Sequence, residues 1–156
     1  MDRIIPVISL WQPWASWIAE GYKGIETRTH TRFKKLAGQE IGIHASNKWD
    51  LTAMPNDYLS PEQSAETKKG PFGEIVCFVR VDYVATTGSH NSQAALIDCG
   101  SVFRQGLFLS PEIKKPREQL KVKGGQGIWH YDLEAKKKVS VEEYRAYKKQ
   151  QLTIIK

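Results

Sequence analysis

The sequence predicts an α+β protein in which a small β-barrel carries an N-terminal helix, short α insertions and a C-terminal helix. Three observations support this fold class. Short apolar segments rich in β-branched residues recur along the chain, one amphipathic helix comes early, and a second helix closes the sequence. A barrel is favoured because its closure removes the exposed edges that so many short strands would otherwise have. With 156 residues, the chain has room for one hydrophobic core.

The expected strands are apolar segments bounded by glycine, proline and polar turn residues. The segment GEIVCFVRVDYVA has the strongest strand pattern of the chain. In chain order, we expect strands at 4–10, 23–30, 40–45, 73–85, 106–110, 118–123 and 127–133.

The first helix is expected over 13–20. Proline suits its first turn, Gly21 suits a left-handed C-terminal cap, and Trp14, Trp17 and Ile18 share one face that we assign to the core. Shorter helical pieces are expected at 48–54, 61–68 and 93–99.

The C-terminal helix is expected over about 140–151. Ser140 and Glu143 have the spacing of a capping box, and Tyr144 and Tyr147 lie on one face that would dock on the rest of the protein. We therefore expect a domain at 1–135 and a basic C-terminal helix or tail at 136–156 that packs on it.

The composition resembles that of a soluble globular protein, with 40% hydrophobic and 26% charged residues. The net charge of +6 and the pI of about 9.3 favour an anionic partner, with nucleic acid first. Residues 134–156 hold seven Lys/Arg against three Glu, so a solvated basic helix is an equally simple explanation. No membrane span or signal peptide is evident, and we expect an intracellular protein, cytoplasmic or nuclear. Cys77 and Cys99 are too few for a disulfide framework.

The common motifs of cofactor enzymes do not occur in this chain. It has no glycine-rich nucleotide loop, no serine elbow, and no paired cysteines or histidines at zinc spacing. We therefore expect neither a cofactor nor a metal.

A dense polar cluster follows the first helix and resembles the signature of a known family. The cluster is Gly21-Tyr22-Lys23-Gly24-Ile25-Glu26-Thr27-Arg28. It matches all four fixed positions of GxKxxExR and so resembles the signature of the ASCH domain family of the PUA-like superfamily. Three further blocks resemble the family in the same order: SLWQPWAS at 9–16, IHAS at 43–46 and VKGGQGIW at 122–129. The resemblance covers residues 4–134, and its layout is most similar to the activating signal cointegrator type, including PNDY at 55–58.

This resemblance implies a PUA-like barrel with a cleft lined by the GxKxxExR segment. It also implies binding of nucleic acid, and we expect RNA in preference to DNA, with protein partners undefined. Some bacterial proteins that share the motif hydrolyse the acetyl group of N4-acetylcytidine, and others are reported as ribonucleases. These two activities are the alternatives to a binding module.

The residue chemistry of the motif allows both roles. Lys23 and Arg28 supply donors that suit a phosphate or a carbonyl oxygen. Glu26 and Arg28 project from the same face if this segment is a strand, so they could instead form a structural ion pair. In an enzyme, Lys23 and Glu26 would be the catalytic residues. However, the resemblance to the family's N4-acetylcytidine hydrolases is incomplete, because those enzymes have a threonine at the position that matches Glu26. A carboxylate cannot supply a hydroxyl.

Other candidate ligand-binding residues lie in the neighbouring blocks. Trp11 could face the cleft and stack on a base. His44, Ser46 and Lys48 follow a strand end and could line the same cleft, although Ser46 could simply cap the next helix. Lys123 belongs to a second basic strip near the last strands, for which solvation is the simpler explanation.

Overall fold

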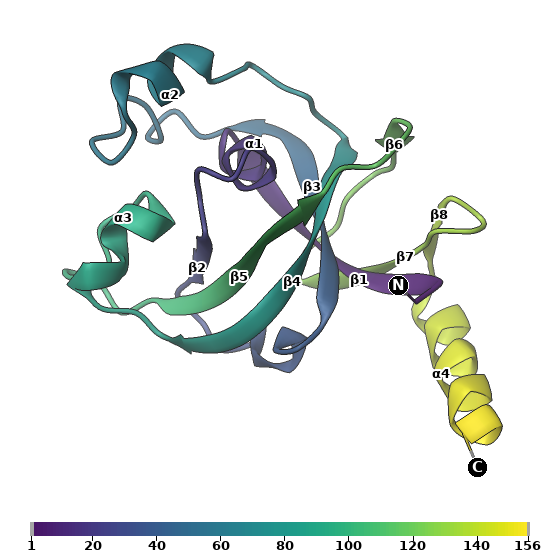
Figure 1. The fold of residues 1–156 in the computed structure, drawn as a ribbon. Coiled ribbons are helices and arrows are strands. Elements are labelled where there is room, and N and C mark those ends of the chain that lie inside the picture. The colour runs from purple at the N-terminus through teal and green to yellow at the C-terminus, as the bar shows by residue number, and fades with distance from the viewer. Residues whose placement is uncertain (1, 156) are drawn as a thin grey trace.

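Eight strands form one mixed sheet in the computed structural model, which describes residues 2–155. The strands are β1 (Ile4–Gln12), β2 (Ile25–Arg28), β3 (Glu40–Trp49), β4 (Glu74–Thr86), β5 (Gln105–Lys114), β6 (Leu120–Lys121), β7 (Ile128–Asp132) and β8 (Lys137–Val139). Their order is β2-β5-β4-β3-β1-β7-β8, and β6 pairs with β4. Only β1 and β3 pair in parallel among these described strands. The sheet curls strongly, as Figure 1 shows.

The helices are short except for the last. They are α1 (Trp14–Ala19), α2 (Pro61–Glu66), α3 (Ser92–Ala95) and α4 (Val141–Ile155), with 3-10 turns η1 (Lys34–Leu36) and η2 (Ser89–Asn91). The predicted α+β class, with an early helix, short α insertions and a C-terminal helix, is confirmed. No helix in the described part of the chain is both long and apolar enough to cross a membrane.

The sheet is open, whereas a closed barrel was expected. Over residues 2–155, β2 and β8 lie at opposite ends of the strand order and do not pair. These strands have only four and three residues, and β8 presents Lys137 and Lys138. Short edge strands that carry lysine are a common means by which proteins avoid edge pairing.

The first strand connects two hydrophobic clusters because both of its faces are covered. Ile8 and Leu10 pack into a cluster that includes α1, whereas Ile5 and Val7 face a second cluster with Trp129. This explains why the segment is almost continuously apolar instead of alternating.

Some sequence-based boundaries are wrong. The helical piece expected at 48–54 is absent from the described chain, because β3 continues through Trp49, which pairs with Gln12. Ser46 therefore lies within a strand and does not cap a helix. The short strand β8 was not predicted. It forms because residues 137–139 pair with β7.

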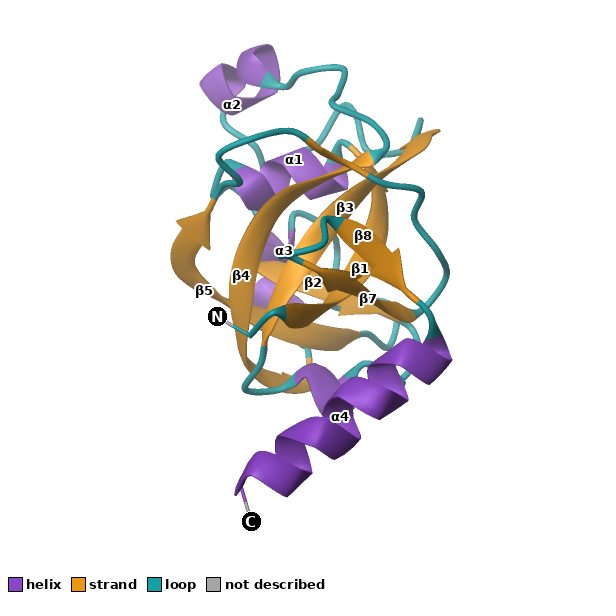
Figure 2. Cartoon of the chain, turned by 90° about the vertical axis from the view of Figure 1, so that its right-hand side faces the viewer, coloured by secondary structure: helices purple, strands orange, loops and turns teal. Residues whose placement is uncertain are grey.

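Figure 2 shows that α4 extends away from the sheet. Ser140 Oγ accepts a hydrogen bond from the Glu143 backbone N–H at 3.1 Å, so it caps the helix. Tyr144 is half-buried and stacks on His130 of β7, with ring centroids 3.5 Å apart. Most of the remaining described side chains of α4 are exposed. This stack therefore attaches the helix to the sheet.

The stack predicts that attachment of α4 depends on pH. Burial, together with the charges of Lys35 and Lys148, lowers the pKa of His130 from 6.5 to about 4. The neutral ring is thus favoured in the folded state, and its stabilising contribution is present above pH 6.5 and lost as the pH falls toward 4. We expect the melting temperature to fall more in wild type than in His130→Phe between pH 7 and pH 4.5, because phenylalanine keeps the stack and does not titrate. Equal pH dependence of the two proteins would contradict this.

Candidate nucleic-acid-binding site

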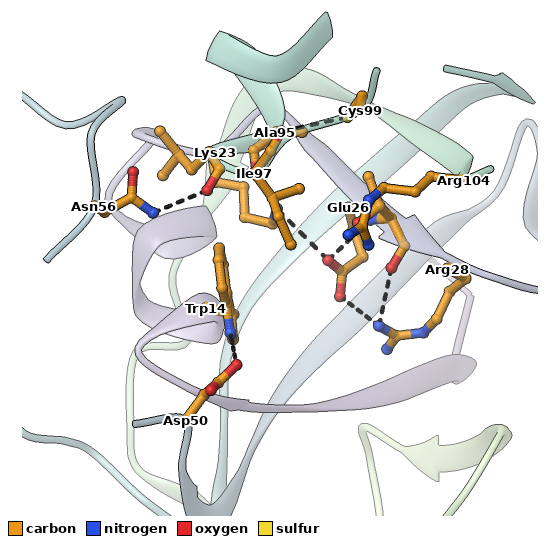
Figure 3. Close-up of polar contacts among 12 residues, drawn as sticks. Trp14, Lys23, Glu26, Arg28, Asp50, Asn56, Ala95, Ile97, Cys99 and Arg104 are labelled. Carbon is orange, nitrogen blue, oxygen red and sulfur yellow. Dashed lines mark hydrogen bonds and ion pairs between the residues drawn. The ribbon is translucent and has the colours of Figure 1, made fainter. Parts of the chain in front are cut away.

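The turn after α1 positions Lys23. Gly21 has a φ of +82°, a left-handed conformation that glycine adopts readily. The chain therefore folds back, and the backbone N–H groups of Tyr22 and Lys23 both donate to Trp17 O, at 2.8 and 3.0 Å. As a result, the Lys23 side chain points into the protein beside α1 (Figure 3).

Lys23 is a buried cation, with 2% of its surface exposed. Its Nζ donates a hydrogen bond to Ala95 O at the end of α3, and lies 3.7 Å from Glu26 Oε1. The same nitrogen is 4.8 Å from the centre of the Trp14 ring. The ammonium is therefore held by a carbonyl, a carboxylate and an aromatic face.

Neighbouring groups also bind the carbonyls at the end of α3. The Gly24 N–H donates to Ala94 O at 2.9 Å, and Asn56 Nδ2 donates to Leu96 O at 2.8 Å. Asn56 belongs to the PNDY stretch, which gives that stretch a structural role. Lys23 thus helps to attach α3 to the motif segment as well as lining the site.

Glu26 links Lys23 to Arg28. Its Oε2 accepts a hydrogen bond from Arg28 Nη1 at 3.0 Å, and its Oε1 accepts one from the Thr27 backbone N–H at 3.0 Å. The side chain of Arg28 remains 25% exposed, whereas that of Glu26 is 6% exposed. The ion pair between Glu26 and Arg28, which the sequence offered as the alternative to ligand binding, is present, and the Arg28 side chain remains partly exposed.

Burial lowers the pKa of Lys23 from 10.5 to about 8, although the nearby carboxylate of Glu26 partly offsets the effect of burial. Asp50 behaves differently. Burial raises its pKa, but hydrogen bonds from Thr52 and from Trp14 Nε1 outweigh this, so the pKa lies below its ordinary value. The site therefore combines Asp50, whose pKa is lowered, with a lysine whose pKa lies near 8.

These side chains surround a cavity of about 370 Å³, which we call the inner cavity. Its volume lies near the lower end of the range of about 300–1,000 Å³ for small-molecule sites, so it suits a single nucleobase or nucleoside better than a strand. The polar groups offer both donors and acceptors, and indole rings form part of the wall. The lining residues are Ser9, Leu10, Trp11, Trp14, Lys23, Glu26, Thr27, Arg28, Asp50, Ile97 and Arg104.

A larger hollow of about 670 Å³ adjoins the inner cavity and shares Ser9, Trp11 and Arg28 with it. We call it the outer groove. None of its described lining residues carries a carboxylate, so its charged groups are all basic. The other lining residues are His30, Arg32, Phe33, His44, Ser46, Asn47, Lys48, Gly73, Val122, Lys123, Gly124, Gly125, Gln126 and Gly127.

His44 has a mainly structural environment within the outer groove. It is 1% exposed, its Nε2 lies 2.7 Å from Val122 O, and its Nδ1 lies 3.0 Å from Ser9 Oγ. Since a carbonyl can only accept, Nε2 carries the proton and Ser9 donates to Nδ1. Ser9 Oγ also accepts from Trp129 Nε1 at 3.1 Å, which leaves little capacity for it to act as a nucleophile. Burial lowers the pKa of His44, so the neutral ring is favoured.

The structure places all eight candidate residues from the sequence around these two hollows. Lys23, Glu26, Arg28 and Trp11 line the inner cavity. Trp11, Arg28, His44, Ser46, Lys48 and Lys123 line the outer groove. Two other members of the second basic strip, Lys114 and Lys115, line neither hollow and instead pair with Glu40 and Glu20. Among the residues described, no three His, Cys, Asp or Glu side chains lie together as a metal ion would require.

Sequence reasoning missed several lining residues. Trp14 was assigned to the core, but it is only half-buried and faces the inner cavity. Asp50 reaches the cavity from the turn after β3, and Arg104 reaches it from the residue before β5. Arg104 lies there because β2 pairs with β5, and this pairing places Gln105, the next residue, opposite Arg28. No sequence motif marks that pairing.

The buried lysine predicts a distinctive titration. We expect the Lys23 side-chain NMR signals to titrate near pH 8, well below an ordinary lysine, and to titrate lower still in Glu26→Gln, because the attraction that raises the pKa is removed. At pH 6, Glu26→Gln should lower the free energy of unfolding by about 3 kcal/mol, since it leaves a buried charge without its partner. Glu40→Gln, which breaks a surface pair, is the control and should not move the Lys23 titration. A Lys23 pKa near 10.5 would contradict this account.

A family model identifies the family of this chain. The family model of the ASCH domain matches residues 8–152, which include much of α4. Among solved structures, a mutant form of ZmASCH from Zymomonas mobilis has a TM-score of 0.52 and 16% identity, over 96% of this chain and 97% of that chain. The ASCH structure from the same organism has a TM-score of 0.49 and 16% identity, over 92% and 93%. Among curated proteins, none matches this chain. The cointegrator type is not distinguished from other ASCH proteins, but the extent of the family match leaves no doubt about the family: the chain belongs to the ASCH domain family.

Proposed function

We propose that this protein binds RNA or another single-stranded or modified nucleic acid, with a base in the inner cavity and the phosphate backbone in the outer groove. The ASCH domain has a PUA-like fold that is often linked to RNA binding. The observation that carries the proposal is the position of a groove whose charged residues are all basic, directly beside a cavity of the size of one nucleobase.

The outer groove has the charge pattern that phosphate binding requires. Arg28 and Arg32 lie on one part of its lining, and Lys48 and Lys123 on others. Lys48 Nζ is also 5.2 Å from the centre of the exposed Trp11 ring, so a cation and a stacking surface occur together. Such combinations of basic and aromatic side chains bind single strands with little sequence preference.

The inner cavity has the mixed polarity that base recognition requires. Glu26 Oε1 and Oε2 are acceptors for base amino or imino groups, and Arg28 and Arg104 are donors for base carbonyls. Thr27 and Arg28 use part of the hydrogen-bonding capacity of Glu26, and Lys23 Nζ lies 3.7 Å from its Oε1, so only the remaining lone pairs would serve a ligand. Binding here would therefore select a base by its edge.

The proposal predicts a strong salt dependence of binding. With a fluorescent 12-nucleotide single-stranded RNA, we expect the affinity to fall as salt rises from 50 to 200 mM. The slope of log K against log[salt] is negative, and it should become less steep by roughly 0.7 for each phosphate contact that is lost, as in Arg32→Ala and Lys48→Ala. Lys69→Ala, an exposed lysine outside both hollows, is the control and should keep the wild-type slope. An affinity that does not change with salt would contradict the proposal.

A hydrolase of modified nucleosides is the second candidate, and the lowered pKa of Lys23 favours it. A neutral amine near pH 8 can act as a general base toward water, and Arg28 or Arg104 could polarise the amide carbonyl of N4-acetylcytidine. Attack of water on that carbonyl would release cytidine and acetate. At the position that matches Glu26, the resemblance gives the family's hydrolases a threonine. In this chain, the neighbouring residue Thr27 also lines the cavity.

This candidate predicts a rate that rises with pH through about 8, as Lys23 loses its proton. Release of cytidine from N4-acetylcytidine, followed by chromatography, should occur with wild type and fall at least 100-fold in Lys23→Met, given the usual contribution of a general base. A labelled RNA in the same incubation tests the ribonuclease alternative. Equal rates for the two proteins, or no turnover, would exclude Lys23 catalysis and leave the binding function.

A further inference from the structure

Exposed apolar side chains occur in three of the segments that supply lining residues to the inner cavity. Trp11 lines the cavity and is 49% exposed. Leu51, which directly follows the lining residue Asp50, is 85% exposed. Val102 and Phe103, which directly precede the lining residue Arg104, are 52% and 55% exposed. We call these four residues the apolar rim.

The rim residues are held outward by firm local structure. Asp50 Oδ1 accepts hydrogen bonds from both the backbone and the side chain of Thr52, and its Oδ2 accepts one from Trp14 Nε1 at 2.8 Å. These contacts tie the turn that carries Leu51 to α1.

The loop between Asp98 and Arg104 is closed in a similar way. Arg104 Nε donates to Asp98 O at 2.9 Å, and the Gly100 N–H donates to Asp98 Oδ1 at 2.8 Å. Val102 and Phe103 lie within this closed loop. Its ends are therefore held together while these two side chains face solvent.

Several exposed apolar side chains in segments that also line one cavity are candidates for contact with its ligand. Each large apolar side chain left in water forgoes the stabilisation that its burial would supply. The rim borders a charged cavity and reaches the basic groove through Trp11, which lines both hollows. A nucleoside held inside the inner cavity would leave Leu51, Val102 and Phe103 uncovered, because none of them lines it.

We propose that the apolar rim holds the bases on either side of the base in the cavity, so that the ligand is a nucleotide within a single strand and not a free nucleoside. This inference rests on the proposed function. The partner is a strand because the outer groove supplies cations for its phosphates, and its flanking bases are unpaired because their faces lie on the rim. A continuous duplex keeps those faces stacked and would not use the rim.

The first experiment compares ligands of different length. The probes are fluorescent 12-nucleotide RNA of random sequence, the same RNA annealed to its complement, and the four nucleoside monophosphates. We expect the single strand to bind most tightly. Phe103→Ala and Trp11→Ala should each weaken it roughly 5-fold to 100-fold, the range that loss of one base–aromatic stack implies. Phe103→Tyr, which keeps the ring, should restore binding.

A matched control is available on α4. Leu152 is 61% exposed and lies outside both hollows, so Leu152→Ala should leave binding unchanged while Leu51→Ala weakens it. Because all these side chains are exposed, the melting temperatures should match that of wild type. A weaker affinity would then report a lost contact.

The second experiment removes bases from the ligand. The strand keeps the base that enters the inner cavity and has abasic sites at the two flanking positions. These abasic sites should weaken binding to wild type. They should have little further effect on the double variant Trp11→Ala/Phe103→Ala. Single-strand binding that the rim variants and the abasic sites leave unchanged would overturn the rim proposal alone. An affinity for a nucleoside monophosphate that equals the affinity for the single strand would also overturn it. If no nucleic acid binds, the proposed function itself is wrong.

Discussion

The burial of the Lys23 ammonium is the constraint on which the rest of the site depends. A charge removed from water must be compensated, and here Glu26 and the Ala95 carbonyl do so. This requirement brings α3 against the motif segment and orients Glu26, which in turn holds Arg28. The same contacts that satisfy the lysine therefore shape the inner cavity. Lys23 is both a structural residue and the group whose chemistry a ligand would meet.

Three surfaces of different character meet at this place. The inner cavity is polar and small, the outer groove is basic, and the rim is apolar and exposed. Trp11 belongs to all three. In the proposed function, the inner cavity would take the edge of a base, the outer groove the phosphates, and the rim the faces of neighbouring bases. Their contact with one another explains the site better than any one of them alone.

The Ser9–His44 pair shows why geometry is needed before a role is assigned. A serine beside a histidine can form a nucleophilic pair. Here, however, the Ser9 hydroxyl accepts a hydrogen bond from Trp129 Nε1, and His44 donates one to Val122 O. Gly124 packs so closely that an added Cβ would lie 2.5 Å from both Ser9 Oγ and His44 Cε1. These contacts hold the strand ends that line the outer groove. Ser9 and His44 therefore have a structural role, and the basic side chains around them remain for the proposed ligand.

The sequence by itself determined the strand-rich α+β class, the early helix with its glycine cap, and the cluster of Lys23, Glu26 and Arg28. It could do so because these features depend on local periodicity and on residues close together in the chain. Closure of the sheet was not determined locally, because it depends on whether two short edge strands meet. Tertiary structure alone decided that Asp50 and Arg104 join the cavity and that Leu51 and Phe103 border it. These residues come from separate segments, which are brought together by strand pairing and by the buried lysine, and neither cause leaves a pattern along the chain.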